Sequence, residues 1–101
     1  MIELNKASFK EKVLEGEERV LVDFNADWCG PCQMMKPVLE EVEKEAGEGR
    51  VFSVNIDENE DLAEEFEVSS IPCLVVFRGG KEIKRSIGVM PKQKVLKLLE
   101  D

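Results

Sequence analysis

The sequence predicts a single α/β domain over residues 1–101, with a central mixed β-sheet flanked by helices on both faces. Three observations lead to this class. The length falls in the usual range of one domain, about 100 to 150 residues. Short apolar runs typical of buried strands alternate with segments in which apolar residues recur every three or four positions, as in helices. A Gly-Gly pair near the C-terminus separates two strand-like runs, as in a β-hairpin.

The first half of the chain predicts two helices and two strands. In order, these are a helix from Asn5 or Ser8 to about Glu15, a strand at 19–25, a helix from Pro31 to about Ala46 and a strand at 51–56. The two strands are expected to be parallel, because a helix connects them. We expect Pro37 to kink the long helix, since proline lacks a backbone N–H.

The second half predicts a helix, a hairpin and a last helix. The helix spans 59–66, the strands span 74–77 and 81–87, and the last helix starts at Pro91 and contains Leu99. Gly79-Gly80 forms the turn, so the two strands are antiparallel. The alternation of Ile83 and Ile87 with polar residues predicts an exposed edge strand, although Arg85 interrupts the pattern.

Composition excludes several kinds of site and partner. The chain has no histidine, which rules out a histidine general base, a Ser/His/Asp triad and imidazole metal sites. Three cysteines are too few, and odd in number, for the disulfide framework of a small secreted protein. Because the chain shows neither a signal-peptide pattern nor a transmembrane run, we expect a cytoplasmic protein with no membrane partner. A formal charge of −8 argues against nucleic acid as a partner.

The charges are unevenly distributed along the sequence. Acidic residues dominate residues 40–67, and basic residues dominate 78–101. The solvated faces of surface helices explain such runs. The alternative is electrostatic steering of an oppositely charged partner.

Cys29 and Cys32 are the candidate reactive pair, and they lie between a predicted strand and a predicted helix. At a helix start, free N–H groups and the helix dipole stabilise a thiolate, so Cys29 is the expected nucleophile. Cys32, one turn later, would resolve the mixed disulfide that Cys29 forms. Gly30 permits close approach of a backbone, and Pro31 fixes the first helical turn. The motif alone also fits half a zinc site or two unrelated core cysteines, but its position after a strand favours redox chemistry.

Further motifs accompany this pair along the chain. They are Trp28-Cys29-Gly30-Pro31-Cys32, Val22-Asp23-Phe24, Lys36-Pro37, Asn55-Ile56-Asp57, Ile71-Pro72, Phe77-Arg78-Gly79-Gly80 and Gly88. Together they resemble the thioredoxin family over essentially all 101 residues. The resemblance implies the thioredoxin fold and a protein-disulfide reductase that is recharged by a thioredoxin reductase and acts on disulfide-containing client proteins. It also implies a monomer without a cofactor or metal beyond its redox-active disulfide.

The resemblance also assigns roles to residues outside the cysteine pair. It implies a cis peptide bond before Pro72, which brings Ile71 beside the thiols, where its backbone can pair with a client segment. Trp28, Ile71 and Gly88 would line this docking groove. Asp23 would be a buried acid beneath Cys32 that moves protons, with its pKa raised by burial. From the residues alone, Asp23 fits a solvated strand end equally well, and Trp28 fits the core.

Four positions depart from the family pattern: Ser53 and Gln33 replace common lysines, Asn25 replaces a common aromatic residue, and Cys73 replaces the usual threonine. With Ser53 we expect no cation near Asp23, which should raise the pKa of that carboxyl further. Losing the cation at Gln33 should weaken thiolate stabilisation slightly.

Cys73 leaves three alternatives open. It packs as a small buried residue, it traps a half-oxidised state or a glutathione adduct, or it joins Cys29 and Cys32 in binding zinc or an iron–sulfur cluster. A four-ligand site would need one more ligand from outside. The alternative for the whole chain is a binding module with incidental thiols, and the intact cysteine pair, Pro72 and Asp23 argue against it. Among redox proteins, Gly30-Pro31 between the cysteines favours a reductant over an oxidase or an isomerase. The identity of the electron donor, an NADPH-linked or a ferredoxin-linked reductase, stays open.

Overall fold

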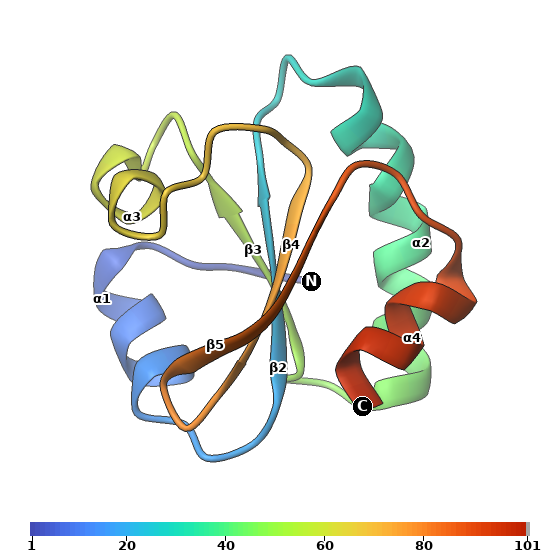
Figure 1. Ribbon diagram of the computed structural model, residues 1–101, viewed down its shortest axis with the longest axis horizontal. Coiled ribbons are helices and arrows are strands. Elements are labelled where there is room, and N and C mark those ends of the chain that lie inside the picture. The colour runs from blue at the N-terminus through green and yellow to red at the C-terminus, as the bar shows by residue number, and fades with distance from the viewer. Residues whose placement is uncertain (101) are drawn as a thin grey trace.

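A five-stranded sheet runs through the middle of the computed structural model, which describes residues 1–100. Helices cover both faces of this sheet (Figure 1). The elements are β1 Ile2–Glu3, α1 Lys6–Phe9, a π-helical segment Lys10–Leu14, β2 Val20–Asn25, α2 Gly30–Ala46, β3 Val51–Asn55, α3 Glu60–Glu65, β4 Cys73–Arg78, β5 Lys81–Ile87 and α4 Lys92–Glu100. The predicted α/β class is confirmed. The last residue of the expected domain, 101, lies outside the described residues.

The sheet is mixed, with the strand order β1-β3-β2-β4-β5. Strand β3 is parallel to both β1 and β2, whereas β4 is antiparallel to β2 and to β5. The predicted parallel and antiparallel pairs are therefore both confirmed. Strand β1 was not predicted, because two residues are too few to show an alternating pattern.

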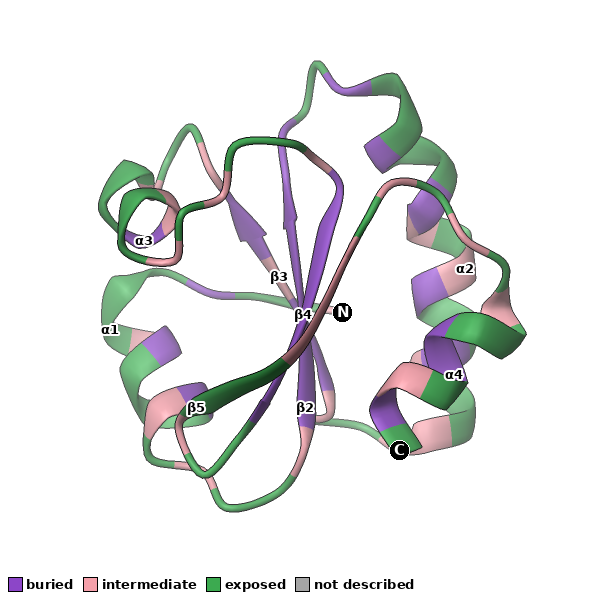
Figure 2. Cartoon of the chain, in the orientation of Figure 1, coloured by how far each residue is buried: buried purple, intermediate pink, exposed green. Residues whose placement is uncertain are grey.

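The central strand β2 is buried along its whole length and separates two apolar cores (Figure 2). Because side chains alternate along a strand, Val22 and Phe24 face one core and Leu21 faces the other. The first core lies under α1 and α3 and contains four phenylalanine rings with centroids 5.2 to 6.3 Å apart, Phe9, Phe24, Phe66 and Phe77. The second lies under α2 and α4 (Figure 1).

A reciprocal pair of hydrogen bonds starts the first helix. The Asn5 side-chain oxygen accepts from the Ser8 backbone N–H at 2.9 Å, and the Ser8 hydroxyl oxygen accepts from the Asn5 N–H at 2.9 Å. Both residues that the sequence suggested as caps thus act together, with Asn5 at the N-cap position. This satisfies two of the N–H groups that a helix start leaves free.

The contacts of the Arg85 side chain account for the polar residue that interrupts the alternating pattern of β5. Strand β5 is an edge strand, as expected, but the Arg85 guanidinium reaches α3 and donates to the carbonyls of Phe66 at 2.6 Å and Glu67 at 3.4 Å. Glu82 holds the same guanidinium through an ion pair of 2.8 Å. The carbonyls that end a helix carry partial negative charge, so a cation is stabilising there. Arg85 therefore joins the sheet edge to the end of α3.

Candidate active site

Cys29 and Cys32 form a disulfide at the first turn of α2, with their Cα atoms 5.2 Å apart. Cys29 is the N-cap residue of this helix, with an extended backbone, and Pro31 stands in the first turn. The Cys29 sulfur accepts a hydrogen bond from the backbone N–H of Cys32 at 3.2 Å. A helix N-terminus that points N–H groups at a sulfur stabilises negative charge there when the disulfide is reduced.

The two sulfur-bearing residues differ in access. Cys29 keeps 5% of its surface exposed, whereas Cys32 is fully buried. A backbone approaching the site also meets open space at Gly30, where an added Cβ would touch nothing within 4 Å. A molecule in solution therefore has access to Cys29 but not to Cys32.

The loop before β4 and the end of β5 complete the surroundings of the disulfide. The Ile71–Pro72 peptide bond is cis, and the Ile71 carbonyl oxygen lies 3.9 Å from the Cys29 sulfur. Gly88, with a φ of 98° that favours glycine, donates its N–H to the Pro72 carbonyl at 2.9 Å. Three segments far apart in the sequence thus meet at this end of the sheet.

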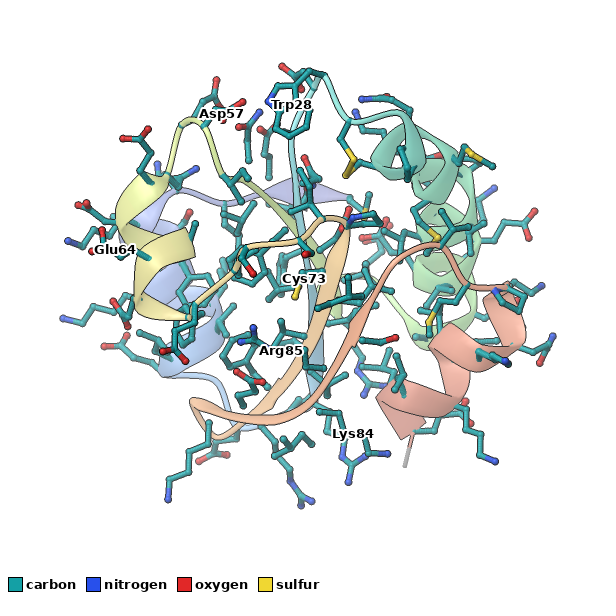
Figure 3. The ribbon with its side chains drawn as sticks, turned by 45° about the horizontal axis from the view of Figure 1, so that its top comes forward. Trp28, Asp57, Glu64, Cys73, Lys84 and Arg85 are labelled. Atoms are coloured by element: carbon teal, nitrogen blue, oxygen red, sulfur yellow. A yellow bond between two sulfur atoms is a disulfide. The ribbon has the colours of Figure 1, made fainter. Side chains whose placement is uncertain are left out.

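Trp28 lies on the surface beside the disulfide rather than in the core. Its side chain is 70% exposed, and its indole N–H donates to the Asp57 carboxylate at 2.8 Å (Figure 3). Two further apolar residues next to site segments, Met34 and Val89, are exposed as well. These side chains give the site an apolar surface, with the indole held in one orientation by its hydrogen bond.

Asp23 is fully buried in β2, so the solvated strand end is excluded. Burial raises the pKa of its carboxyl from the ordinary 3.8 to about 7, while a hydrogen bond from Asn25 and the positive charge of Lys36 act in the opposite direction. The expectation that no cation acts on Asp23 is therefore wrong. Lys36 of α2 supplies one from the helix, although Ser53 leaves none on β3.

Asn25 donates a hydrogen bond to the Asp23 side chain, a contact that was not predicted. The signal was available: residues two apart in a strand share a face of the sheet, so Asn25 had to lie beside Asp23. Gln33, the other polar departure near the motif, donates its amide N–H to the Asp27 carbonyl at 3.2 Å. That bond ties the first turn of α2 to the loop before it.

Cys73 packs in the core under α1 and α3, with 1% of its surface exposed, and its sulfur is not in a disulfide. Burial raises the pKa of its thiol, although Arg85 acts against this. Cys29 and Cys32 belong to a different cluster, with Ala26. Within residues 1–100, no three Cys, His, Asp or Glu side chains are placed to hold a metal ion. The packing alternative for Cys73 therefore accounts for its position.

No helix within residues 1–100 combines the length and the apolar character needed to cross a membrane.

The sequence profile of the family described as "Thioredoxin" matches residues 1–101. A thioredoxin of a Synechocystis strain is 42% identical over 97% of this chain and 92% of its own length. A thioredoxin of Alicyclobacillus acidocaldarius is 44% identical over 97% of this chain and 93% of its own. A "Bifunctional thioredoxin reductase/thioredoxin" of Mycobacterium leprae is 45% identical over 99% of this chain, which covers 22% of that protein. With a whole-length profile match, these relatives and a disulfide-forming cysteine pair at a helix start, the chain belongs to the thioredoxin family.

Proposed function

We propose that this chain reduces disulfides of client proteins in the cytoplasm, with Cys29 as the nucleophile and Cys32 as the resolving thiol. One observation carries the proposal most directly: the disulfide stands at the start of α2 with only Cys29 accessible. An accessible sulfur beside a buried one provides both halves of a reversible thiol exchange.

The reaction proceeds in two exchanges that transfer two electrons to the client. The Cys29 thiolate attacks one sulfur of the client disulfide, a mixed disulfide forms, and the first client thiolate leaves. The Cys32 thiolate then attacks the Cys29 sulfur and releases the second client thiolate. The client thiolates take up two protons, and the chain is left with the Cys29–Cys32 disulfide. The N–H groups at the start of α2 stabilise the attacking thiolate.

Asp23 is the proposed proton acceptor for Cys32. A pKa of about 7 leaves this carboxyl partly ionised and partly protonated near neutral pH, which suits a group that accepts and returns protons. Its Oδ1 atom is buried and has no hydrogen-bond partner among residues 1–100. An unpartnered oxygen is available to a transferred proton, directly or through a water molecule.

The proposed docking surface for clients consists of Trp28, Ile71 and Gly88, and the buried Pro72, in its cis form, would hold the Ile71 backbone in place beneath it. The exposed indole and the neighbouring apolar side chains would cover the client around its disulfide. The Ile71 carbonyl close to the Cys29 sulfur supports pairing with an extended client backbone, a mode of binding that tolerates many sequences.

A thioredoxin reductase is the proposed electron donor, because a related sequence occurs in one protein with that enzyme in Mycobacterium leprae. We propose that the chain acts as a monomer and binds neither nucleic acid nor membrane. Its acidic balance supports the exclusion of phosphate-rich partners. Two assays identify the donor, one with an NADPH-linked reductase and one with a ferredoxin-linked reductase. In each, the reductase supplies electrons to the oxidised chain, and the reductase that sustains client reduction is the donor.

Reduction of insulin disulfides with dithiothreitol as the electron source tests the function without any reductase. We expect the wild-type chain to accelerate insulin precipitation and Cys29→Ser to abolish the acceleration. Cys73→Ser, which changes a thiol in the other core, is the matched control and should retain the activity. Equal rates for the wild type and Cys29→Ser would overturn the catalytic proposal and leave a binding module.

A further inference from the structure

Three polar side chains meet on one face of the sheet beneath α2, and we call Asp23, Asn25 and Ser53 the Asp23 cluster. Asp23 and Asn25 are two residues apart in β2, so their side chains share a face. Strand β3 is in register with Asp23 opposite Ser53. Leu21, which has the same parity in β2, belongs to the core under α2 and α4, so the cluster faces that layer.

The hydrogen bonds within the Asp23 cluster have a definite direction. The Asn25 amide nitrogen lies 2.7 Å from the Ser53 hydroxyl oxygen, 3.2 Å from Asp23 Oδ2 and 3.0 Å from the Asp23 carbonyl oxygen. This nitrogen only donates, so all three oxygens accept. One amide hydrogen is donated to Ser53. The other is shared between Oδ2 and the backbone carbonyl oxygen of Asp23. Asp23 Oδ1, also buried, has no partner among residues 1–100.

We propose that Asn25, held by Ser53, is a positioning residue that keeps the mobile proton of Asp23 on Oδ1, from which it is exchanged with Cys32. The inference rests on the proposed proton transfer between Asp23 and Cys32. In a protonated carboxyl the carbonyl oxygen is the better acceptor and the hydroxyl oxygen carries the proton. A fixed donor at Oδ2 therefore makes Oδ2 the carbonyl oxygen and leaves the proton to Oδ1.

The proton balance of the step is simple. The Cys32 thiol gives its proton to ionised Asp23 at Oδ1, and the Cys32 thiolate attacks the Cys29 sulfur. The client thiolate leaves with the electron pair of the broken disulfide and takes a proton from solvent. When the chain is reduced again, the proton returns from Oδ1 to the Cys32 sulfur. Oδ2 keeps its bond to Asn25 throughout, so no side chain has to rotate.

The surroundings of Asp23 define what else acts on the same carboxyl. From α2, Lys36 supplies a positive charge, and Cys32 of the same helix is the thiol with which we propose that the proton is exchanged. From β4, the Cys73 thiol is close enough for Asp23 to act on its pKa. From β3, Ser53 faces Asp23 and carries no charge. Asn25 is thus the neutral donor of the site, and Lys36 is its cation.

Infrared difference spectroscopy can identify which oxygen carries the proton, independently of activity. The carbonyl stretching band of protonated Asp23 is recognised by its absence in Asp23→Asn. Because a hydrogen-bonded carbonyl absorbs at lower frequency, we expect this band to move to higher frequency in Asn25→Leu and, by a smaller amount, in Ser53→Ala. An unchanged band in both variants would show that Asn25 does not contact the carbonyl oxygen, and it would overturn the proposal.

A kinetic experiment tests the consequence for the resolving step. A fluorescent cysteine peptide is attached to Cys29 as a mixed disulfide at low pH, and its release is followed by anisotropy after a jump to higher pH. Removing the Asn25 amide, which donates to Asp23, favours the protonated form of this carboxyl. In Asn25→Leu we therefore expect the acid limb of the rate profile to move to higher pH, by about one pH unit. At pH 7 release should be about fivefold slower, because the ionised fraction of Asp23 falls by that factor.

Two comparisons separate positioning from a general structural effect. In an Asp23→Asn background, Asn25→Leu should not change the pH profile further, whereas equal slowing in both backgrounds would overturn the proposal. Ser86→Ala, on β5 beyond Leu74 of β4, is the control for Ser53→Ala and should leave the profile unchanged. If the wild type released the peptide but failed to reduce insulin, the proposed function would fail while the role of Asn25 stood.

Discussion

The buried carboxyl of Asp23 makes the stability of the folded chain depend on pH. Its pKa is about 7 in the folded protein and near the ordinary 3.8 when unfolded, so the folded state holds this proton more tightly. The stabilisation linked to the proton is fully present below about pH 4. It is lost as pH rises towards 7, because the unfolded chain ionises first.

Asp23→Asn should remove this pH dependence, because the amide has a similar shape and stays neutral. The difference between the two pKa values corresponds to about 4 kcal/mol, at about 1.36 kcal/mol per pH unit. We therefore expect the variant and the wild type to have similar free energies of unfolding at pH 4. At pH 8 the variant should be more stable, by up to about 4 kcal/mol.

Urea denaturation of the oxidised wild type and variant at pH 4, 6 and 8 measures this difference directly. Other groups titrate alike in both proteins, so the change with pH in their difference isolates Asp23. Asp61→Asn is the control: Asp61 is exposed and forms an ion pair with Lys6 on the surface, so this variant should show little change. A variant that gained the same stability at pH 4 as at pH 8, or none at pH 8, would refute the reasoning.

Three other predictions concern single side chains. Arg85→Ala should lower the free energy of unfolding by about 2 kcal/mol in urea titrations, because it removes the bonds to the last carbonyls of α3; no loss would mean that water replaces the guanidinium fully. Cys73→Ala should purify colourless and metal-free, as the wild type should, and should retain insulin reduction; a metal or a colour lost with the mutation would restore the cluster alternative. Reduction of the disulfide should change the fluorescence of Trp28, which directly precedes Cys29, whereas Asp57→Asn should alter the emission in both redox states by weakening the bond to the indole.

Much of the site could be predicted because its residues belong to single elements. The spacing of Cys29 and Cys32 places both in one helical turn, and a disulfide between them follows from local geometry. The position of Cys29 at a helix start likewise follows from the strand before it and the helix after it. Contacts between elements were harder to predict, as Lys36 shows: nothing in its spacing to Asp23 indicated that a helix residue would act on a strand residue.

The sequence by itself determined the order of the strands and helices that follow β1, the hairpin at Gly79-Gly80 and the cysteine pair, because periodicity and turn residues act over a few neighbouring positions. Only the tertiary structure decided that Asp23 is fully buried beside Asn25 and Ser53, that Cys73 faces the opposite core, and that Arg85 holds the end of α3. The physical reason is that burial and partner choice depend on which segments pack together, and strand register, which sets that packing, joins residues far apart in the chain.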